Sequence, residues 1–411
     1  MKSFINSLVS TVKRWNDYQR FRVFFAELYP ILKKIKVIKL LHTINKGSIL
    51  DPYNHIKNVG TFVNRTYNVE DFNILESLDK YTIDFKSLTT SEKNYTIGFI
   101  LNPNEYDLYN INESCKALDV KQVIFDIGNP DLYEELNNSC VDGILLIPSF
   151  ENNIIRNAFH EAANILFSES CLKIYPTFRE LSIYECKRSL ANFLKINNIP
   201  HPKTKVFYDY ERARNFIDVS DFPVVFKSNI GASSSGVEIL KNKKQALSLA
   251  RRLFFKKYLR RMETDKRSGE WGYMILQEYI HEVSEFRIIK AGDSWFCYQK
   301  WKSERQTFFS GSGMKKMINP LEVVLNFCYD LACKHNFTTM CFDVFMNKQG
   351  RLFVSELQTW FGSFDPSEMY VDNVPGRYYL KNGTWIFEPG FYNVYGSIAL
   401  RLCHFMNLLS E

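Results

Sequence analysis

The stretch MCFDVFM-NKQG-RLFVSELQ, residues 340–358, decides the fold of this chain. Its central segment, NKQG at 347–350, has the composition of a turn, and the apolar segments on either side are strand-like. The sequence therefore predicts a β-hairpin whose two arms each carry an acidic residue, Asp343 and Glu356.

The pairing of the two arms decides how close these carboxylates lie. If Met346 pairs with Arg351, then Val354 lies opposite Asp343, and Glu356 lies diagonally from Asp343 on the same face. Diagonal neighbours are about 7–8 Å apart, a separation that lets two carboxylates share divalent cations. Carboxylates in an apolar hairpin cost free energy unless they are paired or bind a metal. The alternative is a hairpin edge where both acids face water.

A glycine- and serine-rich loop lies upstream of the hairpin. Lys227 is the last residue of an apolar strand. The loop SNIGASSSG, residues 228–236, follows it, and a second strand follows at 237–240. A Walker-type loop leads into a helix instead, so this segment is predicted to be a flexible flap between two strands. Its glycines allow backbone amides to turn toward an anion, and a lysine at its base suits a phosphate.

Composition and length bound the remaining possibilities. The chain has 411 residues, enough for two or three domains, and 45% of them are hydrophobic. No apolar run is long enough for a membrane-spanning helix, and the N-terminus lacks the apolar region of a signal peptide. The nine cysteines show no CxxC pair, as expected for reduced thiols. These features predict a cytoplasmic protein.

The net charge of +7 is concentrated in two segments. Residues 1–50 form a basic, amphipathic helical arm, and residues 251–267 contain three pairs of basic residues. Solvated helix faces are the default interpretation, and attraction to lipid headgroups or an acidic substrate is the alternative. The arm could dock on the protein, pair with another subunit in a homo-oligomer, or lie on the inner face of a membrane. No nucleic-acid-binding module accompanies the charge, so nucleic acid is not an expected partner.

The organisation of the chain changes near residue 176. Within 51–175, short buried strands at 95–101, 121–127 and 141–148 alternate with helical segments, which predicts a Rossmann-like parallel layer. Its first turn lacks the glycines of a dinucleotide fingerprint. Further elements are then predicted: helices at 185–200, 243–259 and 394–409, strands at 205–210, 221–227, 273–280 and 286–291, and a hairpin at 378–387.

Taken together, the order and spacing of these motifs over residues 176–365 resemble the ATP-grasp superfamily, and in particular D-alanine–D-alanine ligases and RimK-like amino-acid ligases. The resemblance implies an α/β chain in which a Rossmann-like pre-ATP-grasp domain, 51–175, precedes a two-lobed ATP-grasp domain, 176–411. The nucleotide-binding lobe would comprise 176–280, with the phosphate flap at 228–236. The metal-binding lobe and the C-terminal helix would comprise 281–411.

The resemblance also implies which residues bind ATP and Mg²⁺. Two lysines, four residues of the loop, four residues of an interdomain hinge and one acid for the ribose would bind the nucleotide: Lys187, Lys227, Gly231, Ser233, Ser234, Gly236, Gln277, Glu278, Tyr279, Ile280 and Glu285. One or two Mg²⁺ ions, or Mn²⁺ as an alternative, would be held by Asp343, Glu356 and Gln358.

Two positions depart from the family pattern. Gln358 stands where the third metal ligand is usually asparagine, and its extra methylene shifts the geometry. Cys341 stands where the ligases usually place an arginine that binds the reacting phosphate. We expect Arg287 and Lys300 to substitute for it as catalytic cations. The alternative for Arg287 is a surface residue on a strand.

The family's chemistry, as the resemblance implies it, joins a carboxylate to an amine. ATP phosphorylates the carboxylate, ADP leaves, and an amine attacks the acylphosphate to form an amide. No Ser/His or Cys/His pairing supplies a side-chain nucleophile. A glycan or peptide end is one candidate acceptor, for instance in polysaccharide biosynthesis. The alternatives are a kinase on the same scaffold and an inactive ATP-binding regulatory protein.

Overall fold

The computed structural model describes residues 80–103, 108–148, 153–231, 236–256, 258, 269–301, 309, 314–316, 321–361 and 367–411. The predicted arm, 1–50, lies outside these residues, as do Ser233 and Ser234 of the flap. The membrane and subunit contacts suggested for the arm therefore stay predictions. Among the described helices, none is both long and apolar enough to cross a membrane.

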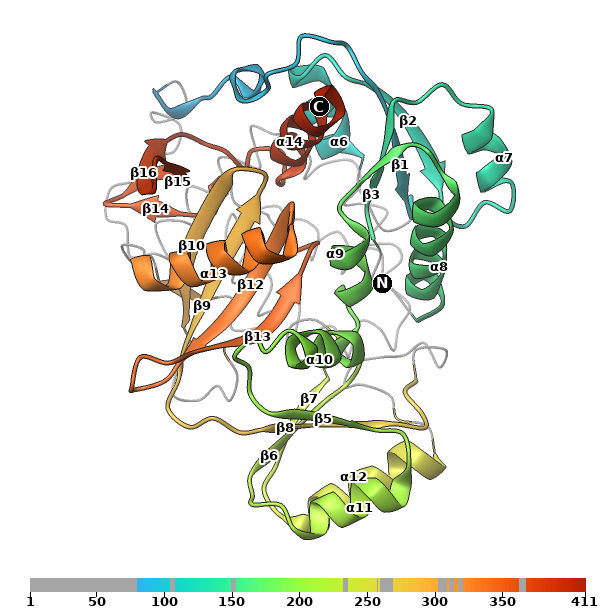
Figure 1. The fold of residues 1–411 in the computed structure, drawn as a ribbon, viewed down its shortest axis with the longest axis vertical. Coiled ribbons are helices and arrows are strands. Elements are labelled where there is room, and N and C mark those ends of the chain that lie inside the picture. The colour runs from blue at the N-terminus through green and yellow to red at the C-terminus, as the bar shows by residue number, and fades with distance from the viewer. Residues whose placement is uncertain are drawn as a thin grey trace, which may run out of the picture.

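A parallel sheet forms the first layer, as the alternation of strands and helices predicts (Figure 1). Its strand order is β2-β1-β3-β4. Ile97, Phe99 and Leu145 on its central strands are fully buried, because helices and neighbouring elements cover both faces. The elements of this part are η1 (Phe85–Leu88), β1 (Thr96–Leu101), α6 (Tyr109–Ala117), β2 (Lys121–Asp126), α7 (Leu132–Asn137), β3 (Gly143–Leu146), α8 (Asn153–Glu169) and β4 (Lys173–Tyr175).

A small antiparallel sheet lies at the opposite end of the molecule from α14, with two helices beside it (Figure 1). Its strand order is β5-β8-β6-β7. The elements are β5 (Thr204–Phe207), α11 (Tyr210–Asp218), β6 (Val224–Lys227), β7 (Val237–Leu240), α12 (Lys243–Phe255) and β8 (Met274–Glu278). The predicted strand 205–210 was too long. It ends at Phe207 because the Asp209 side chain accepts a hydrogen bond from the Arg212 amide and so begins α11.

The large sheet contains eight strands and has α13 across one face (Figure 1). Its main order is β13-β12-β9-β10-β15-β14, with β11 paired to β10 and β16 to β15. The elements are β9 (Ser284–Ala291), β10 (Ser294–Trp301), β11 (Met314–Lys316), α13 (Glu322–His335), β12 (Thr339–Met346), β13 (Leu352–Gln358), β14 (Tyr370–Val371), β15 (Val374–Lys381) and β16 (Thr384–Pro389). The predicted hairpin around Asn382 and Gly383 joins β15 to β16, and both turn residues have positive φ as this turn requires.

Three helices tie the sheets together. Helices α9 (Phe178–Ile183) and α10 (Lys187–Ile196) connect the parallel sheet to the two antiparallel sheets, and α10 lies between the latter (Figure 1). Helix α14 (Ile398–Ser410) returns to pack on α6 and η1. One hydrophobic cluster consequently runs from Phe99 in the parallel sheet to Phe342 in the large sheet. The fold is thus α/β, with a Rossmann-like parallel layer before two antiparallel sheets.

Candidate active site

The two hairpin carboxylates are direct cross-strand partners. Asp343 on β12 pairs with Glu356 on β13, and a register shift separates Asp343 from Val344. The predicted pairing was wrong, because Met346 pairs with Leu352 and Arg351 belongs to the turn. The bulge then moves the register by one more residue, so the two acids lie opposite each other and not diagonally. They are therefore closer than the sequence predicts.

Two cations on neighbouring strands hold Asp343. The strand order β12-β9-β10 places Arg287 and Lys300 beside it. Arg287 donates from Nε and Nη2 to the two carboxylate oxygens, at 2.8 Å each, and Lys300 Nζ lies 2.6 Å from Oδ2. Burial alone would raise the pKa of Asp343, but these cations hold it well below its usual range. Asp343 thus stays ionised although it is only 2% exposed.

Glu285 belongs to the same ionic network. Lys300 Nζ lies 2.6 Å from Glu285 Oε1, and both side chains are buried. Burial lowers the pKa of Lys300, as does Arg287, but attraction to Asp343 and Glu285 gives a net upward shift. Burial, together with the nearby Asp343 charge, raises the pKa of Glu285 against the pull of Lys300. Glu285 therefore serves as counter-ion to Lys300, and its predicted contact with a ribose is a separate proposal.

The second acid, Glu356, meets the lysine that begins α10. Lys187 Nζ lies 3.0 Å from Glu356 Oε1 and donates to Gly231 O, also at 3.0 Å. Burial lowers the pKa of Lys187, yet attraction to Glu356 and Glu185 leaves it above its ordinary value. Burial raises the pKa of Glu356, and Lys187 and Lys227 together more than offset this. The pair therefore stays charged.

Lys227, at the end of β6, has a different environment. Its Nζ donates to the carbonyl of Ser355 at 3.5 Å, beside Glu356 on β13. Burial lowers its pKa, and the attraction of Glu356 offsets this only in part. The structure thus brings Lys187 and Lys227, from two different elements, to the same carboxylate.

Hydrogen bonds hold both described ends of the phosphate flap, residues 228–231 and Gly236. Ser228 N donates to Gly236 O at 2.7 Å, which closes the base of the loop, and Gly231 has a φ of 147°. Gly231 N donates to Glu185 Oε2 at 2.9 Å, while the amides of the two preceding residues donate to Glu270 at 2.9 and 3.2 Å. Sequence reasoning missed Glu185 and Glu270, because single acidic residues far from the loop carry no spacing signal.

The predicted hinge connects the small sheet to the large one. Gln277 lies in β8, where its Nε2 donates to Thr204 Oγ1 at 2.8 Å. Glu278 ends the strand, and its amide donates to Lys203 O at 2.9 Å. Tyr279 and Ile280 follow, partly buried, in the short link from β8 to β9. Their predicted contact with adenine stays a prediction.

The oxygen atoms around Glu356 fit a magnesium ion. Gln358 Nε2 donates to Glu356 Oε1 at 3.0 Å and to Glu185 Oε1 at 3.2 Å. Gln358 Oε1 is buried and has no hydrogen-bond partner among the described residues. With Asp343 and Glu356 it forms the all-oxygen donor set that Mg²⁺ prefers. The described residues contain no cluster of three or more His, Cys, Asp or Glu side chains suited to a metal.

Cys341 does not supply the missing positive charge. It lies opposite Gln358 and is 1% exposed. Burial raises the pKa of its thiol to about 12, so the group stays neutral and is no nucleophile. Arg287 and Lys300 lie nearby, each paired with Asp343, and their predicted role as catalytic cations stays a prediction.

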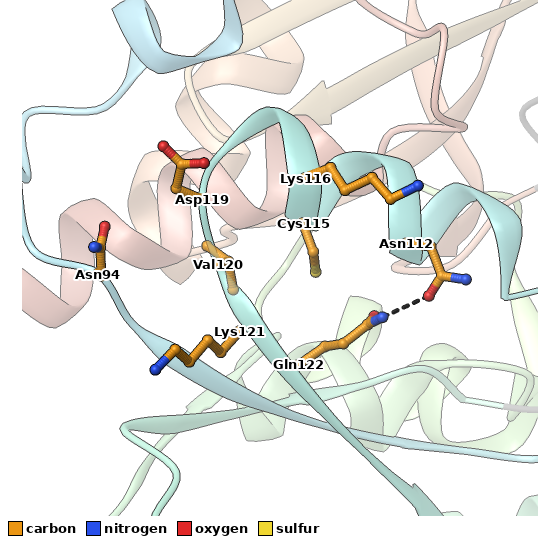
Figure 2. Close-up of a pocket in the computed structure, with 8 residues that line it drawn as sticks. All are labelled: Asn94, Asn112, Cys115, Lys116, Asp119, Val120, Lys121 and Gln122. Carbon is orange, nitrogen blue, oxygen red and sulfur yellow. Dashed lines mark hydrogen bonds between the residues drawn. The ribbon is translucent and has the colours of Figure 1, made fainter.

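A separate hollow of about 620 Å³ opens on the parallel layer, and Figure 2 shows its lining. It lies between α6 and the start of β2, where Gln122 Nε2 donates to Asn112 Oδ1 at 2.5 Å. Cys115 and Val120 form its apolar part, and Lys116 and Lys121 reach out from its rim. None of its lining residues belongs to the carboxylate site.

No protein-family model matches the chain. The bifunctional purine biosynthetic protein ADE1 of Schizosaccharomyces pombe is 30% identical over 106 residues, 26% of this chain and 12% of that protein. The bifunctional purine biosynthetic protein purD of Dictyostelium discoideum is 27% identical over 120 residues, 29% of this chain and 14% of that protein. The chain therefore spans only a small part of the length of these curated relatives.

Several solved structures are similar to part of the chain and share little sequence with it. N5-carboxyaminoimidazole ribonucleotide synthetase from Thermotoga maritima has a TM-score of 0.43 and 18% identity, with 64% of this chain and 68% of that chain covered. A RimK domain ATP-grasp protein from Sphaerobacter thermophilus has a TM-score of 0.43 and 12% identity, covering 64% and 90%. D-alanine–D-alanine ligase from Bacillus anthracis has a TM-score of 0.42 and 16% identity, covering 64% and 86%. The structures similar to this chain include a RimK domain ATP-grasp protein and a D-alanine–D-alanine ligase.

Proposed function

We propose that the chain is an ATP-dependent ligase that joins a carboxylate to an amine. One observation carries the proposal: two opposed carboxylates and four cations from four different elements converge beside the ends of a Gly/Ser loop. The residues are Asp343, Glu356, Lys187, Lys227, Arg287 and Lys300. A site of this kind suits a polyphosphate with its metal, because phosphoryl transfer needs positioning and charge neutralisation more than covalent help.

The lysines would neutralise the phosphates of ATP. Lys187 already lies within reach of Gly231 at the loop, and Lys227 begins the same loop. A bound phosphate would take over the carbonyl and carboxylate contacts that these ammonium groups now make. Fixed positive charges of this kind stabilise the charge that builds up in the transition state.

Asp343, Glu356 and Gln358 would hold Mg²⁺. When bound, the ion neutralises phosphate oxygens and fixes their orientation. Arg287 and Lys300 each use part of the Asp343 carboxylate, whose two oxygens together offer about four lone-pair sites, so acceptor capacity remains.

The proposed reaction has two steps. A substrate carboxylate oxygen attacks the γ-phosphorus, the bond to ADP breaks, and an acylphosphate forms. An amine then attacks the acyl carbon, loses a proton, and displaces inorganic phosphate to leave an amide. Arg287 and Lys300 would neutralise the transferred phosphoryl group. The flap at 228–236 would exclude water, which otherwise hydrolyses the acylphosphate.

The substrates proposed are an acid and an amine of modest size, with a glycan or peptide end as one candidate acceptor. A screen of ADP release over amino acids and sugar acids would identify them. Activity only on free amino acids would argue against the glycan acceptor.

Hydroxylamine trapping tests the ligase chemistry directly. An acylphosphate gives a hydroxamate, whereas a phosphorylated alcohol, the product of a kinase, does not. Glu356→Ala removes a proposed metal ligand and should lower kcat by roughly 10²–10³ or more. ATP binding without turnover on any substrate pool would favour an inactive regulatory protein, and full turnover by the variant would show that the site is assigned wrongly.

A further inference from the structure

Glu185 adopts a backbone conformation that is costly for its residue type. It lies between α9 and α10, has a φ of 43°, and is 5% exposed. Non-glycine residues in the left-handed region cost about 1–3 kcal/mol and persist where surrounding contacts hold them. The contacts that hold Glu185 in this conformation therefore indicate its role.

These contacts join three separate elements. Its backbone carbonyl accepts a hydrogen bond from Arg156 Nη1 of α8, at 2.9 Å. Its Oε2 accepts from Gly231 N at the flap, also at 2.9 Å. Its Oε1 accepts from Gln358 Nε2 of β13, at 3.2 Å. Each carboxylate oxygen thus has a different partner.

The contact with Gln358 fixes which end of its amide faces which way. Gln358 Nε2 donates to both Glu185 Oε1 and Glu356 Oε1, so the NH₂ group of the amide serves both carboxylates. The amide oxygen is therefore bonded to neither carboxylate; it is buried and has no hydrogen-bond partner among the described residues. Without Glu185, one of the two interactions that hold this orientation is lost.

We propose that Glu185 is a positioning residue that aims the Gln358 amide oxygen at a divalent cation and ties that ligand to Gly231 of the flap. The inference rests on the proposed function in that it requires a metal site at Asp343, Glu356 and Gln358. Gln358 has one more rotatable bond than the asparagine that is usual at this position. Its hydrogen bond to Glu185 restricts that extra bond, so a glutamine can still act as a metal ligand here. Groups that orient metal ligands are worth about 10–100-fold in metal affinity.

Mn²⁺ binding tests this role without any turnover. Mn²⁺ affinity would be measured by electron paramagnetic resonance of the full chain with saturating ADP. In wild type, the two carboxylate oxygens of Glu185 accept hydrogen bonds from Gly231 and Gln358. Glu185→Gln keeps only one of these oxygens, so it cannot accept both hydrogen bonds. We expect its Mn²⁺ affinity to fall about 10-fold or more. ADP affinity in the presence of EDTA should change less.

A double-mutant cycle separates positioning from a general structural effect. Gln358→Met keeps the side-chain volume and removes the amide, and it should itself weaken Mn²⁺ binding. In that background Glu185→Gln should have little further effect, within about twofold, because no amide remains to be aimed. A full additive effect in the double variant, or Mn²⁺ affinity within twofold of wild type for Glu185→Gln, would overturn the proposal.

Glu185→Asp gives a second route if Glu185→Gln fails to fold. Aspartate tolerates positive φ better than most residues, and its shorter side chain cannot span both partners. We expect a similar loss of Mn²⁺ affinity, and an unchanged affinity would contradict the proposal. If the wild type binds Mn²⁺ and ADP but gives no hydroxamate, the ligase function fails while the positioning role stands. If the wild type binds no Mn²⁺, both fail.

Discussion

Asp343 is a residue whose charge is compensated before any ligand arrives. Arg287 and Lys300 each form an ion pair with its buried carboxylate. Removing one member of such a group leaves the others buried without compensation, which costs about 3–5 kcal/mol. We predict that Asp343→Asn lowers the free energy of unfolding by about this amount, measured by urea denaturation. Adding Arg287→Gln should recover part of the loss, and an additive loss would contradict this account.

Lys227 gives the site a pH dependence of known sign. Burial lowers its pKa, and a bound phosphate favours the charged form. Above the lowered pKa, binding requires uptake of a proton, so ATP affinity should fall by up to tenfold per pH unit as pH rises. Lys227→Arg should remove this fall, because arginine stays protonated. Lys187→Arg is the control, since Lys187 has a raised pKa and should not set the transition. Parallel pH profiles for wild type and Lys227→Arg would refute the prediction.

At the scale of elements, Glu180 joins the start of α9 to the start of β12. It is fully buried and forms a capping box with Thr177. Its carboxylate also accepts from the amides of Thr338 and Thr339, at 2.8 and 2.7 Å. Glu180→Ala would leave several buried donors unsatisfied, each costing about 1–3 kcal/mol.

We therefore predict that Glu180→Ala lowers the free energy of unfolding by about 3 kcal/mol or more. Thr177→Ala is the matched control, because it removes only the cap and should cost about 1 kcal/mol. Denaturant unfolding followed by circular dichroism measures both. Equal losses in the two variants would mean that the link to β12 contributes nothing.

Sequence patterns predicted elements better than the contacts between them. The β12–β13 hairpin follows from its turn residues and apolar arms, but its register does not, because Arg351 joins the turn and a bulge follows Asp343. The family resemblance indicated Lys187 and Lys227, which the structure brings to Glu356. It gave no signal for Glu185, whose partner Gln358 lies 173 residues away in the chain. Such a contact depends on how three elements pack.

At the scale of the whole molecule, the candidate site belongs to no single sheet. Lys227 comes from the small sheet, Lys187 from α10, and the carboxylates from the large sheet. The segment after Glu278 is one covalent link between the sheets, and Lys227 Nζ donates to Ser355 O across them, so a ligand in the site would add a further contact. Anything that binds only the folded state stabilises it, by about 2.7 kcal/mol at 100 times Kd.

We accordingly predict that Mg²⁺ and a non-hydrolysable ATP analogue together raise the Tm by several degrees, and more than either alone. Glu356→Ala should lose most of this joint effect, because it removes a metal ligand and the partner of Lys187. Glu211→Ala is the matched control, since its ion pair with Arg214 on α11 is exposed and lies outside the proposed site, and its Tm shift should equal that of the wild type. Differential scanning calorimetry measures all three proteins. A full Tm rise in Glu356→Ala would mean that the nucleotide and its metal bind elsewhere.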